Sequence, residues 1–298
     1  MPELPDVTVY VEALRQRVIG ETLHRVAIRG PFLLRTVTPP LEAVFGKTVR
    51  EVARLGKRIV FGFDGDLRLA LHLMIAGRLH WKPLTAPPAK NPLAFFEFDS
   101  GRLLLTEAGT QHRASLHVLA DKEGLRRLNA GGLEVLEAPL ETFAARLQSE
   151  NHTLKRALTD PRLFSGIGNA YSDEILHRAG LSPVAMSQRL SEEQISRLYA
   201  ATREVLMEWV HRLRQQAGTR FPEKVTAFRA EMAVHGRYGQ PCPRCGAKVQ
   251  RIRYASNETN YCAACQTGGK LLADRGLSRL LREDWPRSLD EMEELKKR

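Results

Sequence analysis

Residues 242–265 read CPRCGAKVQRIRYASNETNYCAAC, and this stretch contains every cysteine of the 298-residue chain. The cysteines form two close pairs, Cys242/Cys245 and Cys262/Cys265, in the spacing C-x2-C-x16-C-x2-C. Four thiolates arranged in this way meet the tetrahedral demand of one structural Zn²⁺ ion. Two disulfides are the alternative, and a reducing cytosol disfavours them. We therefore predict a zinc finger whose closed metal site stabilises a fold and performs no catalysis.

The region around these cysteines is strongly basic. The chain has 45 Lys and Arg against 34 Asp and Glu, a formal net charge of +11. A polyanion such as nucleic acid is therefore the first partner to suspect. A run of charge is usually a solvated face, but one beside a zinc motif favours binding. The basic side chains of residues 206–253 include Arg212, Arg214, Arg220, Lys224, Arg229, Arg237, Arg244, Lys248, Arg251 and Arg253.

The composition is that of a soluble chain with two or three domains. Hydrophobic residues make up 43% of it, and no uncharged apolar run approaches the length of a membrane span. The first residues include Glu3, Asp6, Glu12 and Arg15, which a secretory signal would not carry. We expect a cytoplasmic, nucleoid-associated monomer.

Upstream of the cysteines the hydrophobic period is that of helices. Ser191 and Gln194 form a capping box at the start of the last of them, and Gly218 ends it. The predicted helices are 139–148, 153–159, 169–179 and 191–216. Beyond the cysteines, a polar tail over 266–298 predicts two short helices, one around Leu271, Leu272, Leu277, Leu280 and Leu281 and one capped by Ser288–Glu291.

The turn Gly166-Ile167-Gly168-Asn169 opens the third of these helices. Backbone N–H groups at such a turn are able to bind an anion such as phosphate. Asn169 acting as an ordinary helix N-cap is the alternative. The local sequence does not decide between the two.

The first half of the chain has the pattern of an antiparallel β domain. Strand-like runs flank Asp64-Gly65 and Asp99-Ser100-Gly101, both typical hairpin turns. A proline-rich stretch, 83–92, predicts a loop. We expect a β-sandwich or barrel with a helix over 5–19 attached to it.

That helix follows Pro2-Glu3-Leu4-Pro5-Asp6. If Met1 is removed, Pro2 carries a free secondary amine with a pKa near 8, able to attack a carbonyl carbon. Glu3 is placed to transfer protons. The alternative is that Pro5 and Asp6 merely open a helix.

Taken together, the sequence resembles the bacterial formamidopyrimidine-DNA glycosylase and endonuclease VIII family. Four stretches carry the resemblance, in the family's order: Pro2–Asp6, Leu55-Gly56-Lys57-Arg58, Gly166–Tyr171 with Glu174, and the cysteine segment ending Cys265-Gln266. It implies an α+β fold with a catalytic β-sandwich domain (1–125), a helix-two-turn-helix DNA-binding domain (126–235), a zinc-finger β-hairpin (236–266) and the helical tail (267–298).

The resemblance also implies an activity. Such enzymes of base-excision repair flip a damaged nucleotide out of double-stranded DNA. Pro2 would attack C1′ and form a Schiff base, Glu3 would protonate the sugar ring oxygen, and elimination would then break the strand at the 3′ side, often at both. Lys57, Asn169 and the N–H groups up to Gly168 would contact phosphates.

The sequence departs from the family at several positions. Asn257 stands where an arginine is common, so Arg251 or Arg253 on the other hairpin strand is expected to replace it. Ile75 either inserts as an apolar wedge or packs in the core. The loop 107–113 lacks the usual aromatic wedge, and Asp6 replaces a glutamate. The segment 218–237 is short, which favours formamidopyrimidines, oxidised pyrimidines or abasic sites over 8-oxoguanine.

Two other functions remain open at this point. A non-catalytic binder of damaged or structured DNA would fit the altered loops, but it would not need Pro2 and Glu3. A zinc-ribbon RNA-binding protein would explain the charge and the cysteines, but not the N-terminal motif or the glycine turn.

Overall fold

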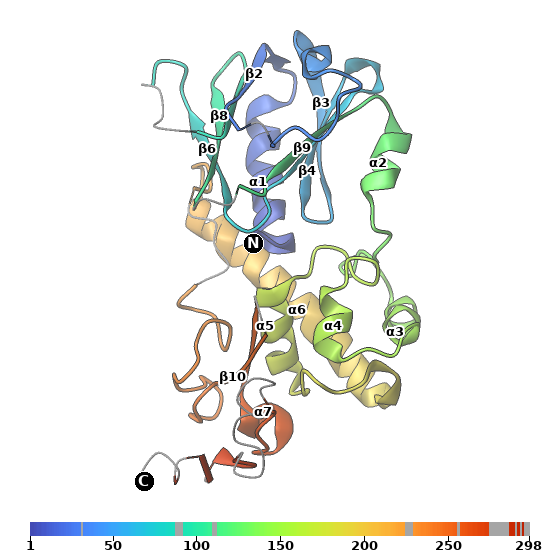
Figure 1. Ribbon diagram of the computed structural model, residues 1–298, viewed down its shortest axis with the longest axis vertical. Helices are drawn as coiled ribbons and strands as arrows, with labels where there is room; N and C mark the ends of the chain where they lie inside the picture. Colours follow the sequence, from blue (N-terminus) through green and yellow to red (C-terminus); the bar gives the residue numbers. More distant parts are fainter. Residues whose placement is uncertain are drawn as a thin grey trace. The chain divides into compact units, whose positions relative to one another are not determined.

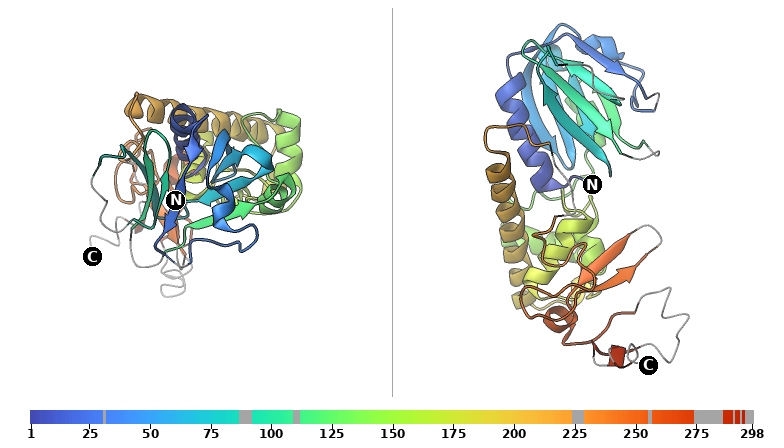
Figure 2. Two further views of the ribbon diagram at one scale, coloured as in Figure 1. Left: turned by 90° about the horizontal axis from the view of Figure 1, so that it is seen from above. Right: turned by 90° about the vertical axis from the view of Figure 1, so that its left-hand side faces the viewer.

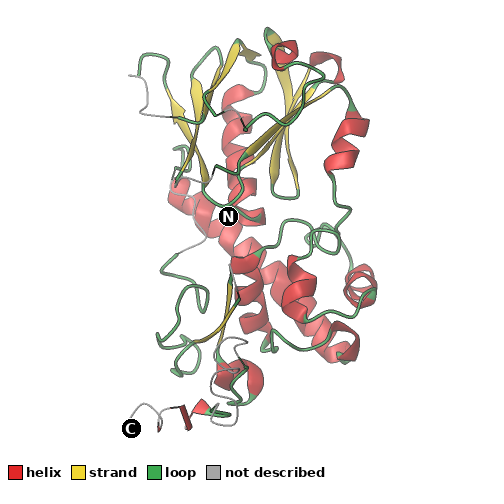
Figure 3. Cartoon of the chain, viewed as in Figure 1, coloured by secondary structure: helices red, strands yellow, loops and turns green. Residues whose placement is uncertain are grey.

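A computed structural model of the chain divides into two compact units (Figure 1). Unit 1 comprises Met1–Gly132 and Met207–Ala227, and unit 2 comprises Leu133–Leu206 and Phe228–Arg298. The structure describes residues 1–30, 32–86, 92–108, 112–223, 229–254, 257–273, 286–289, 291–292 and 294. Strands dominate unit 1 and helices dominate unit 2 (Figure 3).

Unit 1 is a sandwich of two antiparallel sheets, as predicted. One sheet has the strand order β1-β3-β4-β5-β9 and the other β2-β7-β8-β6. Aromatic side chains of both sheets, including Phe61, Phe96 and Phe98, are fully buried in one core. The strands are β1 (Thr22–Leu23), β2 (Arg25–Ile28), β3 (Lys47–Leu55), β4 (Arg58–Phe63), β5 (Arg68–His72), β6 (Gly77–Lys82), β7 (Ala94–Glu97), β8 (Arg102–Glu107) and β9 (Ser115–Leu119).

Helix α1 (Leu4–Val18) packs against β3 and β4 (Figure 2). Val7, Tyr10, Leu14 and Val18 are completely buried, and their spacing of three or four residues places them on one face of the helix. Burying a side chain of this size stabilises the fold by roughly 1.5–3 kcal/mol. The helix is thus fixed to the sandwich along its whole length.

A short helix that the sequence did not predict, α2 (Lys122–Leu128), covers part of the outer face of the five-stranded sheet. Its Leu125 and Leu128 pack on Val60, Ala70 and Leu119. Only part of this face is apolar, and the remainder carries polar side chains from β4, β5 and β9.

Unit 2 contains the predicted helices: α3 (Leu140–Gln148), α4 (Leu154–Thr159), α5 (Asn169–Ala179) and α6 (Glu192–Ala217), whose last residues belong to unit 1. The predicted capping box is present, because Ser191 Oγ accepts from the Gln194 N–H at 3.2 Å and Gln194 Oε1 accepts from the Ser191 N–H at 3.0 Å. No helix within the described ranges is both long and apolar enough to span a membrane.

The cysteine segment forms a hairpin of β10 (Gln250–Arg253) and β11 (Glu258–Tyr261), followed by α7 (Ala263–Thr267). Leu271 of the tail packs against Ile252 and Tyr261 of this hairpin, and the Leu272 N–H donates to Tyr261 Oη at 2.8 Å. The predicted cap at Ser288 is present. Leu277, Leu280 and Leu281 lie outside the described residues.

Candidate functional site

The start of α1 holds Glu3 in a fixed position. The Glu3 N–H donates to Asp6 Oδ2 at 2.9 Å, and the Glu3 carboxylate accepts from the Asp6 N–H in return. Both side chains are buried, with 1% of Glu3 and 0% of Asp6 exposed. Aspartate at position 6 therefore completes a reciprocal capping box, and the predicted helix opening and a chemical role for Glu3 are compatible.

The N-terminal amine lies in a region where the charged form is disfavoured. Burial lowers its pKa below the ordinary value, Glu3 and Asp6 act in the opposite direction, and the positive charges of Arg78 and Lys57 lower it further. In the structure this amine belongs to Met1, and the Pro2 nitrogen forms a peptide bond. The sequence did not single out Arg78, which is an ordinary-looking strand residue until β6 is placed beside α1.

Lys57 occupies the tight turn between β3 and β4. Gly56 has φ +59°, a left-handed conformation that glycine adopts without strain. The Arg54 guanidinium donates to the Gly56 carbonyl at 2.9 Å and stiffens the turn. Lys57 acts electrostatically on both the N-terminal amine and His72, so the structure brings this predicted residue to the same end of unit 1.

Ile75 is exposed, with 54% of its surface accessible, so the alternative that it packs in the core is wrong. It lies in the turn between β5 and β6. Met74 has φ +51°, and a Cβ on Gly77 would lie 2.3 Å from the Leu73 carbonyl oxygen. The turn therefore requires glycine at position 77 and directs an apolar side chain into solvent.

His72 is a second residue that the sequence did not reveal. Its Nδ1 accepts from the Met74 N–H at 3.1 Å, so the neutral ring carries its proton on Nε2. Burial, followed by the charges of Arg58, Lys57 and His117, lowers the pKa of His72 to about 4. The ring is therefore a neutral hydrogen-bond donor at physiological pH.

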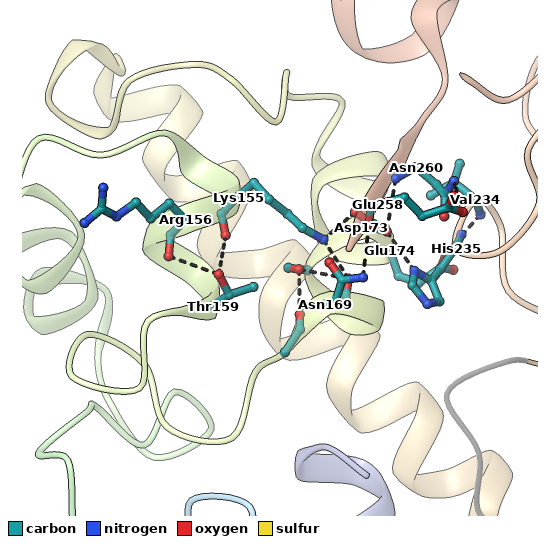
Figure 4. Close-up of polar contacts among 12 residues, drawn as sticks. Lys155, Arg156, Thr159, Asn169, Asp173, Glu174, Val234, His235, Glu258 and Asn260 are labelled. Atoms are coloured by element: carbon teal, nitrogen blue, oxygen red, sulfur yellow. Dashed lines mark hydrogen bonds and ion pairs between the residues drawn. The ribbon is translucent and has the colours of Figure 1, made fainter. Parts of the chain in front are cut away.

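In unit 2, the glycine turn leads into α5 without an asparagine cap. Gly168 is the N-cap and Asn169 is the first helical residue, so the N-cap alternative for Asn169 is wrong. The Asn169 amide instead donates to the backbone carbonyl of Glu258 in the zinc hairpin at 3.0 Å. The turn and the hairpin, both predicted to bind DNA, are thereby joined (Figure 4).

A buried ionic network lies behind this contact. The Asp173 carboxylate is completely buried and accepts from Lys155 Nζ at 2.5 Å, His235 Nδ1 at 2.8 Å and the Asn260 N–H at 3.2 Å. Lys155 Nζ also donates to the Asn169 carbonyl at 2.7 Å. The network connects α4, α5 and β11 and fixes the hairpin against the helices (Figure 4).

Glu174 clamps the chain that enters the zinc segment. Its carboxylate accepts backbone N–H groups of Ala233, Val234 and His235 at 2.7–3.0 Å. Burial raises the pKa of Glu174, although the three N–H groups favour its charged form. This motif residue is therefore structural.

The four cysteines form the predicted structural zinc site, with all Sγ atoms within 4.8 Å of one another. The Sγ atoms of Cys245 and Cys262 lie 3.4 Å apart and those of Cys242 and Cys265 lie 4.0 Å apart, too far for disulfides. Sulfurs about 2.3 Å from a tetrahedral zinc lie about 3.8 Å apart, so these distances fit Zn²⁺. His177 Nε2 lies 3.2 Å from Cys242 Sγ, a contact that the sequence did not suggest.

The hairpin arginines have different surroundings. Arg251 lies over the Tyr238 ring at 4.1 Å and within 3.5 Å of the Glu258 carboxylate. Arg253 is exposed at the end of β10. The Asn257 carbonyl accepts from the Tyr254 N–H at 2.7 Å, so Asn257 closes the hairpin turn. The loop residues 109–111 lie outside the described part of the chain.

A β-sandwich with a capped Pro-Glu helix start, a glycine turn before a helix and a four-cysteine zinc hairpin together define the helix-two-turn-helix class of DNA glycosylases. Comparison with models of protein families supports the same class. The formamidopyrimidine-DNA glycosylase N-terminal domain matches residues 1–110, its H2TH domain matches 133–221, and the zinc finger found in FPG and IleRS matches 239–268.

Curated relatives point the same way. Formamidopyrimidine-DNA glycosylase of Thermus thermophilus is 34% identical over 279 residues, covering 90% of this chain and 100% of the relative. The Heliobacterium modesticaldum enzyme of the same name is 33% identical over 281 residues, covering 89% and 100%. The chain belongs to the formamidopyrimidine-DNA glycosylase family. It is a base-excision repair glycosylase with abasic-site lyase activity.

Solved structures of similar proteins contain DNA. A complex of the LlFpg protein with a THF-DNA and an inhibitor matches with a TM-score of 0.79 and 26% identity, covering 89% of this chain and 100% of that one. MutM in complex with carbocyclic 8-oxo-G containing DNA matches with a TM-score of 0.79 and 27% identity over the same shares.

Proposed function

We propose that the enzyme excises oxidised bases from double-stranded DNA through a Schiff base on Pro2, exposed as the N-terminal residue once Met1 is removed. The observation that carries this proposal is the environment of the N-terminus, where the partly buried Met1 amine has a pKa lowered by burial and by the charges of Arg78 and Lys57, with Glu3 acting in the opposite direction. A lowered pKa increases the fraction of amine that is neutral, and the neutral form has the lone pair that nucleophilic attack requires.

The proposed steps are those that the resemblance to the family implies. The neutral Pro2 nitrogen bonds to C1′ as the glycosidic bond breaks, and the base leaves with the bonding electrons and takes up a proton. The Glu3 carboxylate takes up the proton that the Pro2 nitrogen loses on bonding and gives it to the ring oxygen O4′, so that the C1′–O4′ bond breaks and the ring opens to an iminium ion. The Glu3 carboxylate then takes up a C2′ proton, and the electrons of the C2′–H bond expel the 3′ phosphate by β-elimination. Water finally hydrolyses the imine and frees Pro2.

Damaged double-stranded DNA is the proposed partner. Solved relatives bind DNA containing an abasic site, an oxidised pyrimidine or Fapy-dG. Lys57 and the Gly168–Asn169 turn are proposed to contact phosphates, and exposed Ile75 is proposed to fill the space left by the flipped nucleotide. Formamidopyrimidines and oxidised pyrimidines are the proposed substrates in preference to 8-oxoguanine, because the segment 218–237 is short.

Arg253 is the better candidate for the role of the arginine that Asn257 replaces. Arg253 is exposed beside the hairpin turn, whereas Arg251 is partly buried against Tyr238 and Glu258. Arg253→Ala should weaken binding to an abasic-site duplex more than Arg251→Ala. Unchanged affinity in both variants would remove the arginines from the proposal.

Borohydride trapping on an abasic-site oligonucleotide tests the mechanism. Wild-type protein with a free N-terminal proline, verified by intact mass, should form a covalent adduct. Pro2→Gly should form much less, although it retains an α-amine. If the wild type binds the duplex without trapping, the chain is a non-catalytic binder of damaged DNA, and preference for RNA in parallel titrations would favour the zinc-ribbon alternative.

A further inference from the structure

The outer face of the five-stranded sheet carries a group of cations beyond the area that α2 covers. Ile59 and Phe61 of β4 point into the core, so Arg58 lies on the outer face. In register, Arg58 pairs with His72, and Ala70 pairs with His117. Directly paired residues share a face, which places Arg58, His72 and His117 together on the outer face.

The charged neighbours within this group have one sign. Arg58 and Arg35 both act on His117, and Arg58, Lys57 and His117 act on His72. Arg35 joins from the side, because its N–H donates to the Leu116 carbonyl at 2.8 Å next to His117. Among the described residues, no carboxylate forms an ion pair with Arg58.

Two buried nitrogens in the group also make no hydrogen bond within the described part of the chain: Arg58 Nε and His117 Nδ1. Burial lowers the pKa of Arg58 with no acidic group to offset it. Among the described residues Arg58 therefore has no partner, and a half-buried cation in that state costs free energy of folding. A ligand that brings negative charge and acceptor oxygens would offset this cost.

We propose that Arg58 and His117 bind a backbone phosphate of the DNA, at a subsite separate from the phosphate assigned to Lys57. The guanidinium fork matches two phosphate oxygens, His117 supplies a further donor, and exposed Arg35 adds charge at the margin. The DNA strand would thus run from the damaged nucleotide across the outer face of the five-stranded sheet. This subsite rests on the proposed function only in taking DNA as its ligand.

Salt-dependent binding of Arg58→Gln to a duplex carrying a tetrahydrofuran abasic analogue tests the subsite. We expect about tenfold weaker binding and a slope of log K against log salt that is smaller by about one. His117→Ala should weaken binding less than Arg58→Gln does. The binding free energy lost in the double variant should be smaller than the sum of the losses in the two single variants. Arg50→Gln is the matched control, because Arg50 is a surface arginine at the other end of the same strand pair, β3 and β4, and is already paired with Asp64 at 2.7 Å.

Thermal unfolding separates a ligand role from a structural one. Removing an unpaired, half-buried cation should leave unit 1 as stable as before or more stable. An affinity and a salt slope equal to those of Arg50→Gln, or a large loss of stability in Arg58→Gln, would overturn the subsite. Loss of affinity in Arg58→Gln together with failed trapping by the wild type would leave the subsite standing and remove the Schiff base.

Discussion

The side-chain amide of Asn169 donates to the backbone carbonyl of Glu258 across 3.0 Å, and this bond joins the first residue of α5 to the zinc hairpin. The phosphate contact proposed for Asn169 would therefore be coupled to the position of the hairpin. The contact is direct, and its two partners are separated by 89 residues in the sequence.

Replacing this amide by a carboxylate should be worse than removing it. Asn169→Asp places an acceptor against the Glu258 carbonyl and repels phosphate, whereas Asn169→Ala only loses one hydrogen bond. We expect about tenfold weaker binding of an abasic-analogue duplex for the alanine variant, and a larger loss for the aspartate variant. Fluorescence anisotropy measures both, and equal affinities would show that Asn169 does not face a phosphate.

The buried network predicts a large stability effect at Asp173. Asp173→Asn leaves Lys155 and His235 without their carboxylate, and breaking a buried pair from one side costs roughly 3–5 kcal/mol. Chemical denaturation of the zinc-loaded protein measures the loss. Glu204→Gln is the control, since the Arg178–Glu204 pair is exposed and such pairs contribute at most about 1 kcal/mol. Equal effects of the two substitutions would contradict the assigned role of the network.

His177 should help to hold the metal. A thiolate that accepts a hydrogen bond is oriented for coordination, and loss of such outer contacts typically costs about 10–100-fold in metal affinity. His177→Phe preserves bulk and removes the donor to Cys242. Zinc transfer to a chromogenic chelator should be faster in this variant than in His211→Phe, which alters an exposed position of α6. Identical transfer rates would show that the contact is incidental.

His72 predicts a loss of stability in acid. Its pKa in the folded chain is about 4, below the unfolded value of about 6.5, so the unfolded chain binds more protons between these values. The stability associated with neutral His72 is fully present above pH 6.5 and is lost as the pH falls toward 4. The contribution is at most about 3 kcal/mol.

Unfolding of unit 1 measured from pH 7 to pH 5 tests this dependence, with His72→Gln as the comparison. The variant should show a shallower decline, because glutamine does not titrate. His117 also has a lowered pKa, through burial and then Arg58 and Arg35, so a residual slope is expected. Parallel curves for the two proteins would exclude His72 as a source.

The sequence predicted those structural elements that depend on residues only a few positions apart. The capping box of Ser191 and Gln194, the hairpin turn at Asp64-Gly65 and the cysteine pairs are examples. Helix α2 was missed because a glycine interrupts it and only Leu125 and Leu128 are apolar, although Asp121 caps it through the Gly124 N–H at 2.8 Å.

Contacts between distant segments were not predictable in the same way. Asp173 and His235 are 62 residues apart, and nothing in either neighbourhood specifies the partner. Ile75 follows two apolar residues, so its hydrophobicity alone favoured a buried strand as much as an exposed turn. The backbone conformation of Met74 and the close approach at Gly77 decide the matter, and both depend on how β5 and β6 meet.

The reciprocal bonds between Glu3 and Asp6 have a consequence for how this protein can evolve. The Glu3 carboxylate, which is proposed to transfer protons during base excision, also accepts a hydrogen bond from the Asp6 N–H at the start of α1. Selection therefore acts on this one side chain for both catalysis and stability. A substitution of Glu3 that altered the proposed proton transfer would also remove the hydrogen bond that caps α1, and so would destabilise the start of the helix next to Pro2. Adaptation to a new lesion is therefore expected in the turns that carry Ile75 and Asn257, whose exposed side chains cap no helix.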